Sequence, residues 1–220
     1  MRRHFVFDAY GTLFDLHAAA ERYQAQIGPE WQQLSRTWRS KHLEYTWVHS
    51  LSGQSATFWQ LAEQSLDFAI AATGLSLSAD VRHKLLAAYR TMAAYPEVAE
   101  VLAGLKRGGA RLAILSNGDP DMLADAVRAA GLESLLDDMI SVSAAGIFKP
   151  APAVYRLATD RFGCAAGEIS FQSSNRWDIA GAKAFGFHAV WVNRAAAPDE
   201  YPGLPPDRIV GDLRGLLAAG

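Results

Sequence analysis

Two kinds of hydrophobic pattern divide the chain of 220 residues. After Tyr95, short apolar runs alternate with segments whose apolar positions follow helical periodicity. The runs, which are typical of buried strands, are 111–115, 139–142, 169–172 and 188–192. The helical segments, most of them followed by glycine, are 98–108, 120–130, 153–162 and 178–185. With a first strand at 3–7, this alternation predicts an α/β fold built on a doubly wound, Rossmann-like parallel sheet.

The segment 16–94 has no convincing strand pattern. Its tryptophans, phenylalanine and leucines recur at helical spacing, which is typical of packing between helices rather than of a ligand site. Ser78 is suited to cap a helix that runs to Tyr89. We therefore expect a core domain formed by 1–15 and 95–220, and a helical cap domain, 16–94, inserted after the first strand.

Composition narrows the possible partners. Half of the residues are apolar, which is enough for a sizeable core. A net charge of −2 gives no reason to expect nucleic acid or an anionic membrane as a partner. Cys164 is the only cysteine, which excludes an intramolecular disulfide and a thiolate zinc site. No apolar stretch is long enough for a signal peptide or a membrane span, so we expect a cytoplasmic protein.

Polar residues follow the predicted strands at several places. The carboxyl ends of parallel strands meet at one edge of a sheet, where such folds bind their ligands. The residues that should meet there are Asp8, Gly11, Thr12, Ser116, Asn117, Lys149, Ser173, Asn175 and Asp178. An acid, a hydroxyl–amide pair, a lysine and a second acid thus converge from four separate segments, and this convergence predicts a catalytic site.

These motifs resemble the haloacid dehalogenase superfamily, and within it the L-2-haloacid dehalogenase branch, over essentially the whole chain. The branch is indicated by the run 8–12, by 116–118, by 173–178, and by Arg39 with 43–47 in the cap. The resemblance implies hydrolysis of short (S)-2-haloacids to (R)-2-hydroxyacids through an aspartyl ester on Asp8, with inversion at C2. It also implies a homodimer that needs no metal or other cofactor, with the 2-haloacid and the halide as its small-molecule partners.

The residue types separate a dehalogenase from a phosphatase of the same fold. A phosphatase expels an alkoxide and protonates it with an acid two positions after the nucleophile, where this chain has Tyr10. The phenol of Tyr10, with an ordinary pKa of about 10, is a poor substitute for a carboxylic acid. A halide is a very weak base and needs no proton. Ser173 and Ser174 also replace the Gly-Asp pair that supplies a carboxylate for Mg²⁺, so the residues point away from phosphoryl transfer.

For four residues the roles that the resemblance implies agree with their charge and hydrogen-bonding capacity. Asp8 is suited to attack C2 as a nucleophile, or else to form an ordinary Asx turn. Lys149 is suited to offset the repulsion between Asp8 and the substrate carboxylate, or else to lie on the surface before Pro150. Ser116 and Asn117, placed where a helix begins, are suited to hold that carboxylate, to cap the helix, or to do both.

Other roles are implied by the resemblance. Arg39 would bind the departing halide, with Asn175 as a second hydrogen-bond donor. The alternative is that Arg39 is simply solvated, as most arginines on helices are. Asp178 would orient the water that hydrolyses the ester, or else cap a helix. Thr12 and Ser173 would fix the Asp8 carboxylate by hydrogen bonds. Tyr155 would place a hydroxyl near the nucleophile, or else be an aromatic residue of the core. Tyr10 and Trp177 would form the walls of an apolar pocket.

Three residues depart from the branch pattern, and one of them is Phe148, which stands before Lys149 in the place often held by a tyrosine. Asp119 stands where a small hydroxyl residue is expected, and an inward-pointing carboxylate there should weaken anion binding. Arg176 stands where a small residue is expected, and would either add a cation to the rim of the site or point to solvent. These departures bear on the halide preference and the substrate range. A Mg²⁺-dependent phosphatase of the same fold is an alternative function, and a non-catalytic protein that binds small anions is another, in which Asp119 and Arg176 would reflect lost turnover.

Overall fold

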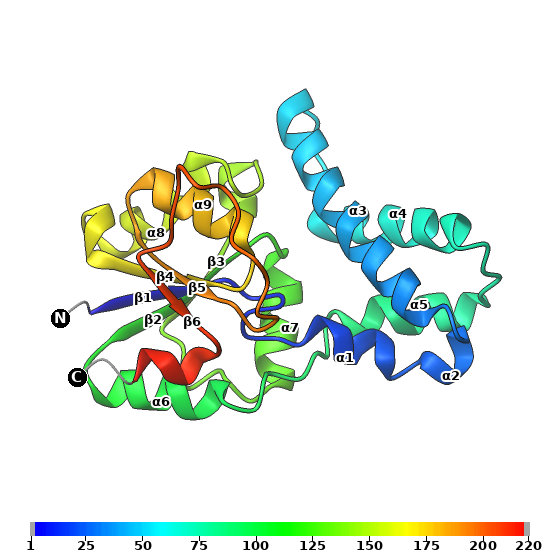
Figure 1. Ribbon diagram of the computed structural model, residues 1–220, viewed down its shortest axis with the longest axis horizontal. Helices are drawn as coiled ribbons and strands as arrows, with labels where there is room; N and C mark the ends of the chain where they lie inside the picture. The colour runs from blue at the N-terminus through cyan, green and yellow to red at the C-terminus, as the bar shows by residue number, and fades with distance from the viewer. Residues whose placement is uncertain (1–2, 218–220) are drawn as a thin grey trace.

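A six-stranded parallel sheet forms the centre of the larger part of the molecule (Figure 1). The computed structural model describes residues 3–217. The strands are β1 His4–Phe7, β2 Arg111–Ser116, β3 Asp138–Ser141, β4 Ile169–Ser173, β5 His188–Val192 and β6 Arg208–Val210. Their order is β3-β2-β1-β4-β5-β6 and every neighbouring pair is parallel. The predicted doubly wound α/β sheet is therefore confirmed.

Helices cover both faces of this sheet (Figure 1). They are α6 Val98–Arg107, α7 Pro120–Ala129, α8 Pro152–Phe162 and α9 Arg176–Phe185, with short 3-10 helices at Val142–Ala145, Ala166–Glu168 and Leu213–Leu216. Helices α8 and α9 lie on one face and α6 on the other. The strand order reverses between β1 and β4, so a crevice opens beyond the carboxyl end of β1, where Asp8 lies.

The segment after β1 folds into helices alone, as the sequence predicts. These are α1 Leu16–Glu21, α2 Gln24–Ile27, α3 Trp31–Ser52, α4 Phe58–Ala72 and α5 Ala79–Ala88, and they form a separate bundle beside the sheet (Figure 1). Ser78 caps α5 as expected, because its side chain accepts a hydrogen bond from the Val81 amide. The exact domain limits, 16–94 for the cap and 1–15 with 95–220 for the core, remain a prediction.

Two connections join the core to the cap, and they run side by side. Phe14 and Ala94 form an antiparallel bridge. The Asp15 amide donates to the Ala93 carbonyl over 3.0 Å, and the Tyr95 amide donates to the Leu13 carbonyl over 3.0 Å. The outgoing and returning chains are thus tied together directly behind the loop that carries Asp8.

Packing inside the cap follows the aromatic pattern read from the sequence. Leu34, Trp38, Phe58 and Leu61 are buried between helices. The Trp38 indole donates to the Ala62 carbonyl over 2.9 Å, which ties α3 to α4. Interhelical packing is thus confirmed for these four residues, whereas Trp47 of the same pattern packs against Trp177 of the core. No helix within residues 3–217 is long and apolar enough to cross a membrane.

Candidate active site

The loop after β1 presents Asp8 at the carboxyl edge of the sheet. The Asp8 amide still donates to the Gln172 carbonyl of β4, over 2.9 Å, so the strand ladder holds the backbone of this residue. The chain then turns sharply through Gly11, whose φ of +86° favours glycine. A Cβ at Gly11 would lie 3.2 Å from the Ser174 hydroxyl, so glycine also permits close contact with the loop after β4.

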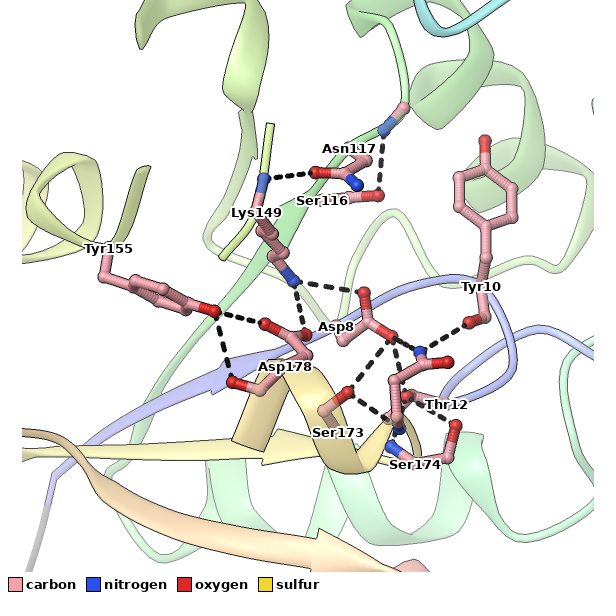
Figure 2. Close-up of polar contacts among 12 residues, drawn as sticks. Asp8, Tyr10, Thr12, Ser116, Asn117, Lys149, Tyr155, Ser173, Ser174 and Asp178 are labelled. Carbon is pink, nitrogen blue, oxygen red and sulfur yellow. Dashed lines mark hydrogen bonds and ion pairs between the residues drawn. The ribbon is translucent and has the colours of Figure 1, made fainter. Parts of the chain in front are cut away.

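Four side chains hold the Asp8 carboxylate (Figure 2). Its Oδ2 accepts hydrogen bonds from Thr12 Oγ1 at 2.9 Å, from Asn175 Nδ2 at 2.9 Å and from Ser173 Oγ at 3.4 Å. Its Oδ1 accepts only from Lys149 Nζ, at 3.1 Å, among these contacts. The carboxylate is thereby fixed through one oxygen, while the other keeps a lone pair available for attack.

Lys149 lies between two carboxylates. Its side chain is 1 % exposed, and Nζ is 3.1 Å from Asp8 Oδ1 and 2.8 Å from Asp178 Oδ2. Burial alone would lower the pKa of Lys149, but the two carboxylates outweigh it and raise that pKa above its usual value. The alternative of a surface lysine before a proline is wrong. The ammonium instead supplies a buried positive charge directly at the nucleophile.

Asp178 is the second buried acid of the site. Its Oδ1 accepts a hydrogen bond from the Tyr155 hydroxyl over 2.8 Å (Figure 2). Burial and the nearby Asp8 charge, opposed by Lys149, raise the pKa of Asp178 to about 6. Helix α9 begins at Arg176 with Asn175 at its N-cap position, so the alternative of Asp178 as a helix cap is wrong. Tyr155 is both buried in the core and bonded to this acid.

Ser116 and Asn117 lie at the carboxyl end of β2 and are buried. The expectation that they stand at the start of a helix is wrong, because α7 begins only at Pro120 and its N-cap position is Asp119. Ser116 Oγ accepts a hydrogen bond from the Gly118 amide over 3.1 Å. Asn117 Oδ1 accepts from the Lys149 amide over 3.0 Å (Figure 2), so this side chain fixes the backbone that carries the ammonium.

Arg39 reaches the site from helix α3 of the cap. Its Nη2 donates to Asn175 Oδ1 over 3.4 Å, and Asn175 in turn donates to Asp8. Its Nη1 is buried and has no hydrogen-bond acceptor. An unpaired buried donor costs stability unless an acceptor arrives, so this nitrogen is well suited to receive an anion. Arg39 therefore combines with the core residues, as the sequence predicts.

The two expected wall residues have different surroundings. Tyr10 is 2 % exposed, and its hydroxyl has no hydrogen-bond partner. Burial, with the nearby Tyr89 hydroxyl and the Asp119 charge, raises the pKa of Tyr10 far above its usual value. Its ring packs against Phe58 with the ring centroids 5.7 Å apart. Trp177 is half-buried, packs edge-on against Trp47, and lines a cavity of about 410 Å³ together with Arg39 and Asn175.

Asp119 and Arg176, which depart from the branch pattern, have different surroundings. The two oxygens of Asp119 accept hydrogen bonds from the Phe58 and Trp59 amides of α4, at 3.2 and 2.9 Å, so the expected weakening of anion binding has no geometric basis. Arg176 is 4 % exposed and pairs with Asp199 at 2.5 Å. Its side chain therefore does not point to solvent, and its charge is paired with Asp199. Arg176 still lines the same cavity as Arg39 and Trp177, and its Nη1 is buried without a hydrogen-bond partner.

Sequence reasoning missed some residues of the site. Ser174 donates its amide to Thr12 Oγ1 over 2.8 Å and so helps to hold the Asp8 loop. Phe58 and Tyr89 pack against Tyr10 from the cap. Ser174 could have been found from its place after a strand, whereas the two aromatic residues carry no signal apart from ordinary helical periodicity. Across the described residues 3–217, no group of three or more His, Cys, Asp or Glu side chains is placed to hold a metal ion.

Comparisons with known proteins agree with this geometry. The model of the haloacid dehalogenase-like hydrolase family matches residues 3–186. The chain is 46% identical over 211 residues to (S)-2-haloacid dehalogenase 1 of Pseudomonas sp. strain CBS-3, covering 96% of this chain and 93% of that protein. A crystal structure described as a dehalogenase matches with a TM-score of 0.97 at 42% identity, covering 100% and 98% of the two chains. The L-2-haloacid dehalogenase of Xanthobacter autotrophicus with chloropropionic acid covalently bound matches with a TM-score of 0.88 at 33% identity, covering 100% of each chain.

Proposed function

This chain belongs to the haloacid dehalogenase superfamily and to its L-2-haloacid dehalogenase branch, and we propose that it hydrolyses short (S)-2-haloacids to (R)-2-hydroxyacids without a cofactor. The observation that carries the proposal is the pairing of Asp8 with the buried Lys149 ammonium, with a buried Tyr10 in place of a second acid. The raised pKa of Tyr10 makes it a poor proton donor. The site is thus equipped to expel a group that needs no proton.

The first step is nucleophilic attack by Asp8. Its Oδ1 is the attacking atom, because Oδ2 already accepts three hydrogen bonds. An electron pair of Oδ1 forms the bond to C2 from the face opposite the halogen. The carbon–halogen bond breaks, and its two electrons leave with the halide. The product is an ester of Asp8 with inverted configuration at C2. Lys149 offsets the repulsion between Asp8 and the substrate carboxylate.

The departing halide moves toward Arg39. Its unpaired Nη1 is a charged donor that gains an acceptor only when an anion is present, so it stabilises the charge that develops on the halogen. Asn175 bridges Arg39 and Asp8 and is the second donor beside this position. Ser116 and Asn117 hold the substrate carboxylate at the end of β2, and Tyr10 and Trp177 limit the apolar space around C2 and C3.

The second step is hydrolysis of the ester. Asp178 takes a proton from water, which attacks the acyl carbon of Asp8 rather than C2. When the tetrahedral intermediate collapses, the alkoxide of the hydroxyacid leaves and takes the proton from Asp178. The Asp8 carboxyl group then loses the second proton of the water to solvent, which regenerates the carboxylate. Tyr155 and Lys149 hold the Asp178 carboxylate in place during this transfer. No bond to C2 breaks in this step, so the inverted configuration persists in the product.

We further propose that the protein works in the cytoplasm as a homodimer. The C-terminal end of α3 extends beyond the rest of the cap (Figure 1), and Val48 and Leu51 on it are 54% and 89% exposed. An apolar surface of this kind is suited to contact a second copy. The single unpaired Cys164 agrees with a reducing compartment.

The decisive experiment offers each enantiomer of 2-chloropropionate to the purified protein with EDTA present. Chloride release from the S enantiomer alone, with D-lactate as product, is the expected result. A single turnover in ¹⁸O-water should then place the label in Asp8, and Asp8→Asn should abolish release while the circular dichroism spectrum is unchanged. Label in lactate alone would contradict the ester mechanism. Silence toward all 2-haloacids, combined with phosphate release from esters in Mg²⁺, would favour a phosphatase instead.

A further inference from the structure

Arg194 follows strand β5 and contacts both of the chains that connect the core to the cap. We propose that Arg194 is a positioning residue for the nucleophile, which it holds through Thr12. The inference rests on the proposed function, in which Asp8 attacks the substrate. Arg194 lines the same cavity as Arg39, Asn175 and Trp177, but its side-chain hydrogen bond and ion pair are to Thr12 and Glu97 rather than to Asp8 or those residues.

The contact with the outgoing chain is a hydrogen bond. Arg194 Nη2 donates to the Thr12 carbonyl over 2.9 Å. Two contacts reach the returning chain. The same Nη2 lies 2.7 Å from Glu97 Oε1, and the guanidinium carbon lies 3.8 Å from the centroid of the Tyr95 ring. One side chain therefore fixes the outgoing and the returning connection against the end of β5.

The ion pair between Arg194 and Glu97 is largely buried. The Glu97 side chain is 4% exposed and that of Arg194 is 17% exposed. A buried carboxylate without its partner is strongly unfavourable, so the ion pair is expected to persist in the folded protein. The turn after β5 also directs Arg194, because the neighbouring Asn193 accepts from the Ala197 amide and donates to the Ala197 carbonyl, each over 2.9 Å.

The path from Arg194 to the reacting atom is short. Thr12 is fully buried, and its carbonyl is held by Arg194 while its hydroxyl donates to Asp8 Oδ2 over 2.9 Å. A shift of the Thr12 backbone would therefore move the hydrogen bond that orients the nucleophile. Small errors in the alignment of reacting atoms reduce rates steeply while they affect binding of the substrate little.

The test measures ester formation in Arg194→Gln under single-turnover conditions, by the mass of the quenched protein after mixing with (S)-2-chloropropionate. We expect the rate to fall roughly tenfold to a hundredfold with KM within about twofold, because positioning and not binding is impaired. Arg194→Lys should recover part of the rate, since an ammonium can still pair with Glu97. Arg214→Gln is the matched control, because the Arg214 side chain is 57% exposed and pairs with Asp212, and this variant should leave the rate unchanged.

A double-mutant cycle tests whether Arg194 acts through Thr12. Arg194→Gln should cost much less in a Thr12→Ala background, because the hydroxyl that transmits the effect is already gone. Fully additive effects, an unchanged rate in Arg194→Gln, or a change confined to KM would each overturn the proposal. Should Arg194→Gln not fold, Arg194→Lys carries the same cycle.

A second measurement separates failure of the positioning role from failure of the proposed function. Hydrogen exchange of the backbone amides in 8–15 should accelerate in Arg194→Gln, or in Arg194→Lys, relative to Arg214→Gln, whether or not a haloacid is turned over. If the wild-type protein releases no halide, the proposed function fails. Unchanged exchange in residues 8–15 would refute the positioning role of Arg194 in either case.

Discussion

At the scale of single residues, the central feature of the site is that the carboxylates of Asp8 and Asp178 share the ammonium group of Lys149. Lys149 lies within hydrogen-bond distance of both Asp8 and Asp178, so the buried group of three carries one uncompensated negative charge when both acids are ionised. The two acids also have different neighbours, since Asp8 accepts from three further side chains and Asp178 from Tyr155. This asymmetry suits one acid to attack carbon and the other to exchange a proton with water.

The raised pKa of Asp178 predicts the pH dependence of turnover. An acid whose pKa is about 6 is ionised at pH 8 and becomes protonated as the pH falls through 6, so it can no longer take a proton from water. Formation of the ester removes the Asp8 charge that helps to raise this pKa, so the acid limb of kcat should lie below pH 6. We expect kcat to fall about tenfold for each pH unit below that limb, as steady-state chloride release would show.

Asp178→Asn provides the matched test of this assignment. The variant should accumulate the Asp8 ester, visible by mass spectrometry, at pH 8 as well as at pH 5. If the ester did not accumulate and the wild-type acid limb survived in the variant, a different group would have to be the base.

Gly118 is predicted to be needed for the position of Tyr10. A Cβ at residue 118 would lie 2.8 Å from Tyr10 Cε2 and 3.1 Å from Leu123, so Gly118→Ala forces the ring to move in a packed environment. We expect a loss of about 1–3 kcal/mol in the free energy of unfolding, measured with urea. Gly203→Ala is the control, because a Cβ there meets no atom within 4 Å, and equal losses in both variants would contradict the argument.

Residue roles differ in how far the sequence could predict them. Asp8, Lys149 and Asp178 follow strands, so their meeting at one edge was predictable from the alternation of strands and helices. Asp119 and Arg176 were visible as unusual residues, but their directions were not predictable. Their partners are Phe58, Trp59 and Asp199, which become neighbours only in the tertiary structure.

The start of helix α4 is built from both parts of the molecule. Thr57 forms a capping box with Gln60 inside the cap. Asp119, from the core, adds a second set of acceptors for the first two helical amides, and its negative charge also lies at the positive end of the helix dipole. Phe58, whose amide donates to Asp119, packs its ring against Tyr10 in the loop that carries Asp8.

This dual arrangement yields a prediction at the level of the element. Asp119→Ala should cost about 1 kcal/mol of unfolding free energy and should also raise KM, because Phe58 loses its anchor to the core. Thr57→Ala removes only the cap within the helix and should cost a similar stability at unchanged KM. Unfolding in urea measures the loss of stability, and chloride-release kinetics measure KM. An equal KM in the two variants would mean that the contact of Asp119 with α4 does not affect substrate binding.

Strands and helices were predictable to within a few residues wherever a long periodic segment existed. The start of α9 was placed two residues late, because Arg176 and Trp177 do not look like the beginning of an apolar stripe although Asn175 initiates the helix. Strand β6 was not predicted. It has three residues, lies at the sheet edge and leaves Ile209 53% exposed, so it has neither the length nor the alternation that indicates a strand.

At the level of the whole molecule, the cap is fastened to the core at several places around the site. Asp119 holds α4, Ser50 of α3 accepts a hydrogen bond from the Phe148 amide over 3.2 Å, and Arg90 pairs with Asp121 and Asp125 of α7. Arg39 adds its contact with Asn175. These contacts come from α3, α4 and the segment after α5, so Arg39 belongs to a cap that is bound to the core on several sides rather than through its two connections alone.

The projecting end of α3 leads to a prediction for the assembly. Leu51 is 89% exposed, and an apolar cavity of about 650 Å³ beside it is lined by Trp47, Ile147 and Leu204. Exposed apolar surface of this extent costs free energy in water, and a second copy that covers it would recover that energy. Leu51→Glu places a charge in this surface and should convert a dimer into a monomer, as light scattering after size exclusion would show. Glu44→Gln, on the same helix and already exposed, should leave the mass unchanged. A wild-type mass of one chain, or a dimer that survives Leu51→Glu, would mean that this end of α3 does not join two copies.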